Sequence, residues 1–457
     1  MFYLIYLVIV FTTVWGLIPI SIGIISVLIC FFVWMLFDKD IVYVAPCIIT
    51  PFYIFFRAQS VEYVLGSIVP EFFMIFAFLY FLYNSSKKDY RFPPFIKSIP
   101  FVALIAHLLY TSFNGFAYIK ISLTYIVFIR VYIVPIVFLL TFLLVAQQNV
   151  RLIRKGLIYY FSSICVVVAV ALAQYFNIFH IPTGDWINFG RYLTTSETAD
   201  FLRGTSNVSE RQLFGISGIR INLLLGGSLG TIAAFTMCLG LVQLVFKNTI
   251  SSRFSILMNI GAIICIVGSI LTFSTSILTT LIWFFFWILV YKRISLFKVG
   301  TIMFVVALFL LQSQMIFEIS PLDYFFESIV YSLASLFHQN LLFNWLIGIG
   351  PTLNVAGFMM RPENHITDVG VFKVMQESGI INMLFVLLFI FYTYRRIYFF
   401  LKFDMSKQRI VCAILFSICL TVIHVNTISQ PPFNVLFVLA VAGSLRPIGI
   451  IKPKTIS

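Results

Sequence analysis

Long apolar runs, separated by short polar stretches, make up most of this 457-residue chain. A helix needs about 20 apolar residues to cross the hydrocarbon core of a bilayer, and about 17 are tolerated. On this pattern the sequence predicts about fourteen membrane spans, at residues 3–15, 18–37, 41–57, 64–83, 98–113, 130–147, 157–178, 223–246, 255–272, 276–291, 299–315, 380–397, 410–424 and 432–446. The segment 116–131 contains Lys120 and Arg130 and also fits a re-entrant or interfacial helix.

Two long polar segments, 179–222 and 316–379, interrupt this series of spans. Lys and Arg accumulate in the cytoplasmic loops of membrane proteins. Such residues gather here in the shorter connections and at the C-terminal end, around positions 87–97, 151–155, 247–253, 292–298, 395–409 and 446–454. These connections are therefore expected to face the cytoplasm, and both long segments the outside. An even number of spans places both termini in the cytoplasm.

Composition agrees with a membrane environment, since 61% of the residues are hydrophobic and only 10% are charged. A soluble domain carries about a quarter charged residues. The predicted fold class is an all-α integral membrane protein, one polytopic domain over residues 1–457. Its N-terminus lacks a charged region and a cleavage site, which predicts a retained first span.

The net charge of +14 is spread over the short connections, so it indicates topology rather than nucleic-acid binding. The seven cysteines lie within apolar runs and lack metal-ligand spacing. We therefore expect no disulfide, no metal site and no cofactor.

The first external segment carries four arginines, Arg191, Arg203, Arg211 and Arg220. Positive residues are disfavoured on the outer side, and a guanidinium is well shaped to hold phosphate oxygens. These arginines are candidates for binding a phosphate or pyrophosphate. The alternative is ion pairing with the four acidic residues of the same segment. Arg211 and Arg220 are favoured because they come just before the span at 223–246, near a lipid headgroup.

The second external segment begins with an amphipathic stretch, expected to lie on the membrane surface. After the sequence GIGPTLN it places Arg361, Glu363, His365 and Asp368 within eight residues. An imidazole titrates near neutrality, and a neighbouring carboxylate can orient it or act as a base. This cluster is the predicted catalytic group. The spacing differs from HExxH, so zinc is not expected.

Four charged residues fall within or beside predicted spans: Arg57, Glu71, Lys120 and Arg130. Charges in lipid are costly and normally face a bundle interior or a cavity. Arg130 is the strongest of these secondary candidates because it lies near the external end of its span.

The chain resembles the superfamily of Wzy-type O-antigen polymerases and O-antigen ligases over roughly residues 180–400. Three features carry the resemblance: the sequence RINLLLGGSLGTIAAF after an arginine-containing loop, the turn LTFSTSILTTL, and the late external loop that runs from GIGPTLN through ENHITDVG to QESGII. Many members of the family have an arginine in the serine-rich turn, where this chain has Phe273-Ser274-Thr275-Ser276. Either another arginine, such as Arg130, then serves the phosphate, or the site is organised differently.

The resemblance implies a glycosyltransferase of the GT-C type in the bacterial inner membrane, acting at its outer face without metal or nucleotide sugar. It would join oligosaccharide units carried on undecaprenyl pyrophosphate into a surface polysaccharide, together with a flippase and a chain-length regulator. Arg211, Arg220, Arg203, Arg361 and Arg130 would hold the pyrophosphate. His365, with Glu363 or Asp368, would activate the acceptor hydroxyl. The alternatives are an O-antigen ligase that transfers glycan to lipid A core and a polysaccharide flippase.

Overall fold

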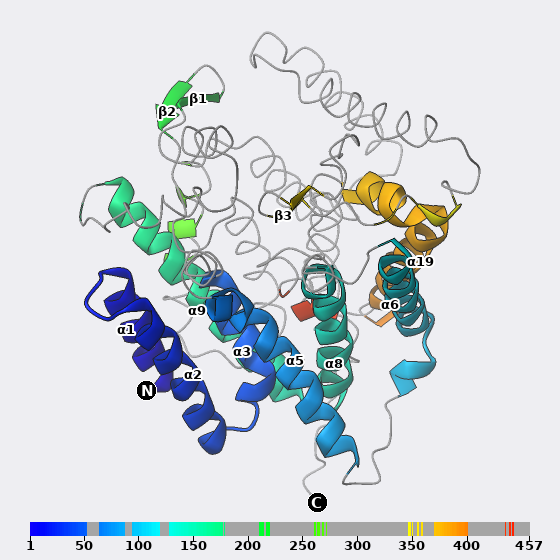
Figure 1. The fold of residues 1–457 in the computed structure, drawn as a ribbon, viewed down its shortest axis with the longest axis horizontal. Coiled ribbons are helices and arrows are strands. Elements are labelled where there is room, and N and C mark those ends of the chain that lie inside the picture. The colour runs from blue at the N-terminus through cyan, green and yellow to red at the C-terminus, as the bar shows by residue number, and fades with distance from the viewer. Residues whose placement is uncertain are drawn as a thin grey trace, which may run out of the picture.

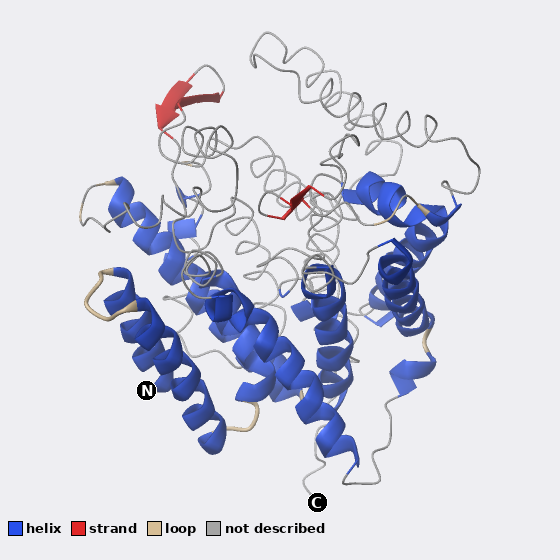
Figure 2. Cartoon of the chain, in the orientation of Figure 1, coloured by secondary structure: helices blue, strands red, loops and turns tan. Residues whose placement is uncertain are grey.

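The computed structural model describes residues 1–52, 64–86, 94–118, 128–176 and 370–400, together with shorter pieces within 178–219, 260–271, 346–359 and 435–442. The described part is a bundle of helices that run up and down beside one another (Figures 1 and 2). Its helices are α1 (Phe2–Val14), α2 (Ile20–Phe37), α3 (Ile41–Ile49), α5 (Val64–Ser86), α6 (Ile99–Tyr118), α8 (Val134–Gln148), α9 (Val150–Tyr175) and α19 (Gly370–Phe400). Three short helical turns adjoin these helices: η1 (Thr50–Phe52) follows α3, η3 (Pro94–Lys97) precedes α6, and η4 (Ile129–Ile133) precedes α8.

Each of these helices overlaps one of the first seven predicted spans or the span at 380–397. Three of them are long and apolar enough to cross a bilayer, over Ile68–Ser86, Ile99–Ala117 and Arg151–Ala173. The membrane character predicted from the sequence is therefore confirmed for this part of the chain. The predicted spans between 223 and 315 and after 400 lie outside the described residues, apart from a few single positions.

One predicted boundary is wrong, at basic residues. α9 begins at Val150, so Arg151 and Lys155 lie in its first turns rather than in a connecting loop. Arg and Lys are good helix formers, and their long side chains reach the polar headgroups from a helix end. The helix therefore continues past the end of the apolar run.

Two small antiparallel hairpins add to the helices, although the sequence predicted an all-α fold. β1 (Glu210–Leu213) pairs with β2 (Ile216–Ile219) inside the first predicted external segment. β3 (Asn354–Val355) pairs with β4 (Phe358–Met359) inside the second. Only Phe214 and Gly215 separate the two strands of the first hairpin in the sequence, a spacing typical of a two-residue hairpin.

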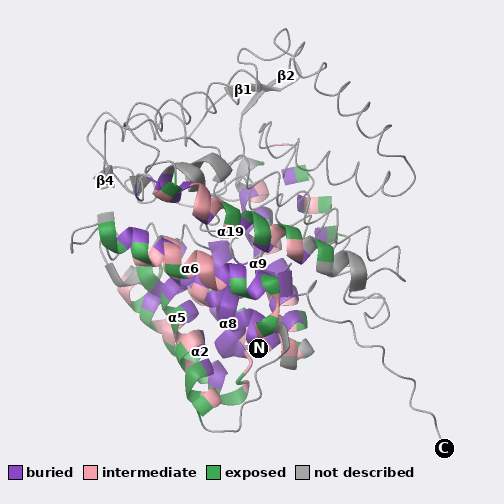
Figure 3. Cartoon of the chain, turned by 90° about the vertical axis from the view of Figure 1, so that its right-hand side faces the viewer, coloured by how far each residue is buried: buried purple, intermediate pink, exposed green. Residues whose placement is uncertain are grey.

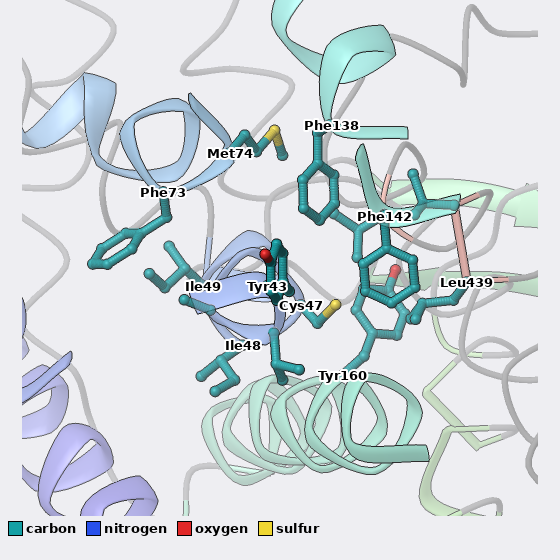
Figure 4. Packing of buried hydrophobic residues seen from close by; sticks show 14 of the residues in the cluster. Tyr43, Cys47, Ile48, Ile49, Phe73, Met74, Phe138, Phe142, Tyr160 and Leu439 are labelled. Atoms are coloured by element: carbon teal, nitrogen blue, oxygen red, sulfur yellow. The ribbon is translucent and has the colours of Figure 1, made fainter. Parts of the chain in front are cut away.

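The centre of the bundle is α3, all nine of whose residues are buried. Its side chains Tyr43, Cys47 and Ile49 lie among residues of α5, α8 and α9, including Phe73, Phe138, Phe142 and Tyr160 (Figure 4). Figure 3 shows that buried residues gather in the interior of the bundle. α3 is thus a short, fully buried apolar helix that packs among longer helices.

The outer faces of the bundle are apolar as well. On α2, Ile22, Ile25 and Ile29 are each more than half exposed and lie along one helix face. In water such a stripe would be an aggregation site, whereas lipid tails cover it without cost. The surface is therefore that of a protein immersed in a bilayer.

At one end of the bundle an ion-pair cluster joins two connections that the sequence places on the cytoplasmic side. Lys155 Nζ lies 2.8 Å from both carboxylate oxygens of Asp38 and 2.7 Å from Asp40 Oδ2. Asn149 Nδ2 donates to Asp40 Oδ1 at 3.2 Å. The α2–α3 connection and the start of α9 therefore lie together, as the predicted alternation of spans requires.

Candidate functional site

Of the eight residues predicted for the site, the structure describes the side chain of one, Arg130. Arg203, Arg220, Arg361, Glu363, His365 and Asp368 lie outside the described residues. Arg211 is described by its backbone, on β1 opposite Gly218 of β2. Arg130 is therefore the one predicted site residue whose side-chain contacts the structure describes.

Arg130 lies in the π-helical turn η4 that precedes α8. Its Nε donates to Glu71 Oε1 of α5 at 2.7 Å, and the two side chains are 19% and 9% exposed. Asn149, at the other end of α8, contacts the Lys155 cluster. Since a helix rises 1.5 Å per residue, Arg130 lies about 25 Å from the predicted cytoplasmic end. It occupies the half of the bundle predicted to be external.

The described residues use only part of the hydrogen-bonding capacity of the Arg130 guanidinium. An arginine carries five N–H donors, of which the Nε–H group is used by Glu71. Among the described residues, no hydrogen bond or ion pair involves Nη1 or Nη2. This pair of terminal nitrogens is the part of a guanidinium that binds a phosphate in bidentate fashion. The arrangement is suited to holding an anion while Glu71 fixes the side chain.

A second polar contact lies at the same turn. The hydroxyl of Tyr132 donates to the Glu377 carboxylate, with both oxygens at 2.9 Å. Glu377 belongs to α19 and is 4% exposed. Residues two apart on a helix face different sides. The turn η4 thus contacts Glu71 of α5 through Arg130 and Glu377 of α19 through Tyr132.

The backbone around Glu377 is held by a junction of glycines. Gly350 N donates to Glu377 O at 3.0 Å. Gly379, with φ of 76° and ψ of 176°, interrupts α19, and a side chain there would collide with Leu346 O. A Cβ at Gly348, with φ of 87°, would collide with the Glu377 backbone. The residues 346–350 therefore pack backbone to backbone against the kink of α19, which we call the glycine junction.

Asn114 of α6 ties this junction together. Its Nδ2 donates to Ile347 O at 3.0 Å and to Glu377 O at 3.1 Å. The side chain is buried, with the residue 2% exposed, and its Oδ1 has no hydrogen-bond partner within the described part of the chain. A buried acceptor of this kind is costly unless something donates to it. Asn114 Oδ1 is thus a buried acceptor that the described residues leave unmatched.

A polar network continues from the junction along α6 and α19. His107 Nδ1 lies 2.7 Å from Asn382 Oδ1, and Asn382 Nδ2 donates to Thr111 Oγ1 at 3.1 Å and Ser378 Oγ at 2.9 Å. Because the amide nitrogen faces the two hydroxyls, Nδ1 of His107 carries the proton. This network connects α6 and α19, two helices far apart in the sequence.

Sequence reasoning missed three members of the site: Asn114, Tyr132 and Glu377. Glu377 stands in the QESGII sequence that supported the family resemblance, so a signal was present. Tyr132 is one of 22 tyrosines and Asn114 one polar residue in a long apolar run, and neither is distinctive before the helices are assembled. No group of three or more potential metal ligands occurs among the described residues.

Comparisons with protein-family models, with curated proteins and with solved structures found no match for this chain.

Proposed function

We propose that this chain is a multi-pass protein of the bacterial inner membrane that polymerises oligosaccharide units carried on undecaprenyl pyrophosphate. The proposal includes about fourteen spans, both termini in the cytoplasm and a site at the outer face. One observation supports it: in the half of the bundle predicted to be external, Arg130 is fixed by Glu71 through Nε, and no contact among the described residues uses its terminal nitrogens. Such a group is suited to a pyrophosphate.

Transfer from a polyprenyl pyrophosphate requires a cation that stabilises the negative charge that develops on the leaving group. The serine-rich turn FSTS lacks the arginine common in the resembling family, and Arg130 supplies a guanidinium from another span. Arg211, Arg220, Arg203 and Arg361 remain predicted partners of the same anion. The His365 cluster remains a predicted acceptor-activating group.

The test is complementation of a deletion strain, with the length of the surface polysaccharide read from a gel. We expect Arg130→Ala to abolish the ladder of long chains and Arg130→Lys to retain part of it. Arg151→Ala is the matched control, because Arg151 is exposed at the opposite end of the bundle. Arg211→Ala, Arg220→Ala and His365→Ala test the predicted loop residues in the same assay.

The product left by the deletion separates the related activities. Deletion of a polymerase leaves a core capped with single units, whereas deletion of an O-antigen ligase leaves no capped core. If the Arg130→Ala strain made wild-type ladders at a normal protein level, Arg130 would not be part of the site.

One observation favours a second candidate, a flippase for the same lipid-linked units. Transporters place charged side chains inside the bundle, and the Glu71–Arg130 pair and Glu377 lie there. Accumulation of lipid-linked units that face the cytoplasm after deletion would support this candidate.

A further inference from the structure

The π-helical turn η4 is held by side-chain hydrogen bonds to two different helices. Arg130 Nε donates to Glu71 Oε1 of α5 at 2.7 Å. The Tyr132 hydroxyl lies 2.9 Å from both carboxylate oxygens of Glu377 in α19. The two anchoring residues of η4 are separated by one position, so a change in the backbone of the turn moves both of them. The contact with α19 is therefore linked to the position of Arg130.

The backbone of η4 is one that needs such support, because π turns are rare and occur as single turns within α-helices. The N–H group of Val134 donates to the carbonyl oxygen of Ile129, five residues back. A π turn fits about one more residue into a turn than an α-helix does, so the same residues in α-helical form would point in other directions. Arg130 would then no longer lie against Glu71.

The Tyr132 ring is held in place as well as its hydroxyl. It stacks on Phe128, with ring centroids 5.4 Å apart and an angle of 22° between the ring planes. Phe128 is 1% exposed, and its ring packs on Gly115 of α6, where an added Cβ would collide with it. The backbone of Glu377 is in turn fixed by the glycine junction. Packing against α6 and α19 therefore fixes both partners of the Tyr132–Glu377 hydrogen bond.

We propose that Tyr132 is a positioning residue for Arg130. Its hydrogen bond to Glu377 keeps η4 in the π form, in which Arg130 lies against Glu71 and holds the pyrophosphate of the lipid-linked donor. This inference rests on the proposed function and adds to it that donor affinity depends on a contact with α19. Tyr132 acts only through Arg130 and touches no part of the donor. Glu377, which is 4% exposed, has the burial expected of such an anchor.

The experiment measures the dissociation constant of undecaprenyl pyrophosphate with the full chain in lipid nanodiscs. Tyr132→Phe removes the hydroxyl and keeps the ring that stacks on Phe128. We expect this variant to bind the lipid about tenfold or more weakly, the effect of losing one hydrogen bond to a charged group. A loss of this size would mean that Arg130 no longer reaches the pyrophosphate.

Tyr3→Phe is the matched control, because the Tyr3 hydroxyl also connects two helices. It lies 3.1 Å from Ser163 Oγ, between α1 and α9 rather than at η4. Both tyrosine variants should lower the thermal unfolding midpoint by similar amounts, since each loses one interhelical hydrogen bond. The affinity of Tyr3→Phe for the lipid should stay within about twofold of the wild-type value.

A second measurement tests whether Tyr132 acts through Arg130. Arg130→Gln keeps a donor for Glu71 and removes the charge, and it should itself weaken binding about tenfold or more. When Tyr132→Phe is added to Arg130→Gln, the further loss of affinity should be less than about twofold, because the two residues act as one unit. A residue with a separate role in stability would instead weaken binding by the same factor in both backgrounds.

The outcomes that contradict the inference differ from those that contradict the proposed function. Wild-type affinity in Tyr132→Phe, or an equal loss in the presence and absence of Arg130→Gln, would overturn the inference alone. Wild-type affinity in Arg130→Gln would overturn the anion site, and the inference with it. A wild-type protein that does not bind undecaprenyl pyrophosphate would overturn the proposed function and therefore both.

Discussion

Arg130 and Glu71 form an ion pair between α8's leading turn and α5, with Nε 2.7 Å from Oε1 in the interior of an apolar bundle. Removing one partner of a buried pair leaves an uncompensated charge and costs about 3–5 kcal/mol. Arg130→Ala is therefore expected to lower the thermal unfolding midpoint in detergent. Arg130→Lys keeps the charge and should lower it less.

The same pair allows a test that distinguishes a loss of stability from a loss of function. When both charges are replaced, as in Glu71→Leu with Arg130→Leu, most of the lost stability should return, because apolar replacement of a buried pair is close to neutral. The proposed activity should stay absent in the double variant. Recovered polymer in that variant would contradict the anion-binding role of Arg130.

Gly379→Ala should destabilise the protein by about 2 kcal/mol or more. A positive φ disfavours any side chain by about 1–2 kcal/mol, and the new Cβ would also collide with Leu346 O. The control is Gly16→Ala, since Gly16 has φ of 72° but open space around its position. Comparison of the two unfolding midpoints isolates the steric contribution. Equal shifts would show that residues 346–350 do not press on the kink.

His107 and Asn382 should be energetically coupled by about 1–2 kcal/mol, as contacting polar residues in one network are. The measurement is a double-mutant cycle of His107→Ala and Asn382→Ala on the free energy of unfolding. Thr141→Ala serves as the reference partner for His107→Ala, because its hydroxyl bonds within α8 to Val137 O at 2.8 Å. That second cycle should be additive to within about 0.5 kcal/mol.

The orientation of the bundle can be measured with single cysteines in a cysteine-free protein. Leu17, which is 73% exposed, and Lys39, also exposed, lie at the two ends of α2. Leu17→Cys should react with an impermeant maleimide in spheroplasts with intact inner membranes, and Lys39→Cys after permeabilisation. The reverse pattern would invert the predicted topology and move Arg130 to the cytoplasmic half.

The helices of the described residues were predictable because a bilayer imposes a simple length rule on apolar sequence. The predicted start of the seventh span was wrong, because α9 begins at Val150 and includes Arg151. The turn η4 was not predicted either, since a π turn is set by local packing and leaves no periodic signature in so uniform a sequence.

The site was predictable only where charge made a residue conspicuous. Arg130 was selected because a cation in a span is costly, and its partner Glu71 was noted on the same ground. Tyr132 and Glu377 are 245 positions apart, so their contact depends on how α8 and α19 assemble. The sequence GIGPTLN predicts a helix break, but neither the break at Gly379 nor its packing against residues 346–350 was predicted.

The glycine junction has a consequence for how such a chain can diversify. One backbone hydrogen bond joins Gly350 to Glu377, and α19 begins at Gly370, before the second of these residues. A change in the length of the sequence between residues 351 and 369 leaves both partners of that hydrogen bond in place. Related chains could therefore differ over these residues while they keep the contact between the glycine junction and α19.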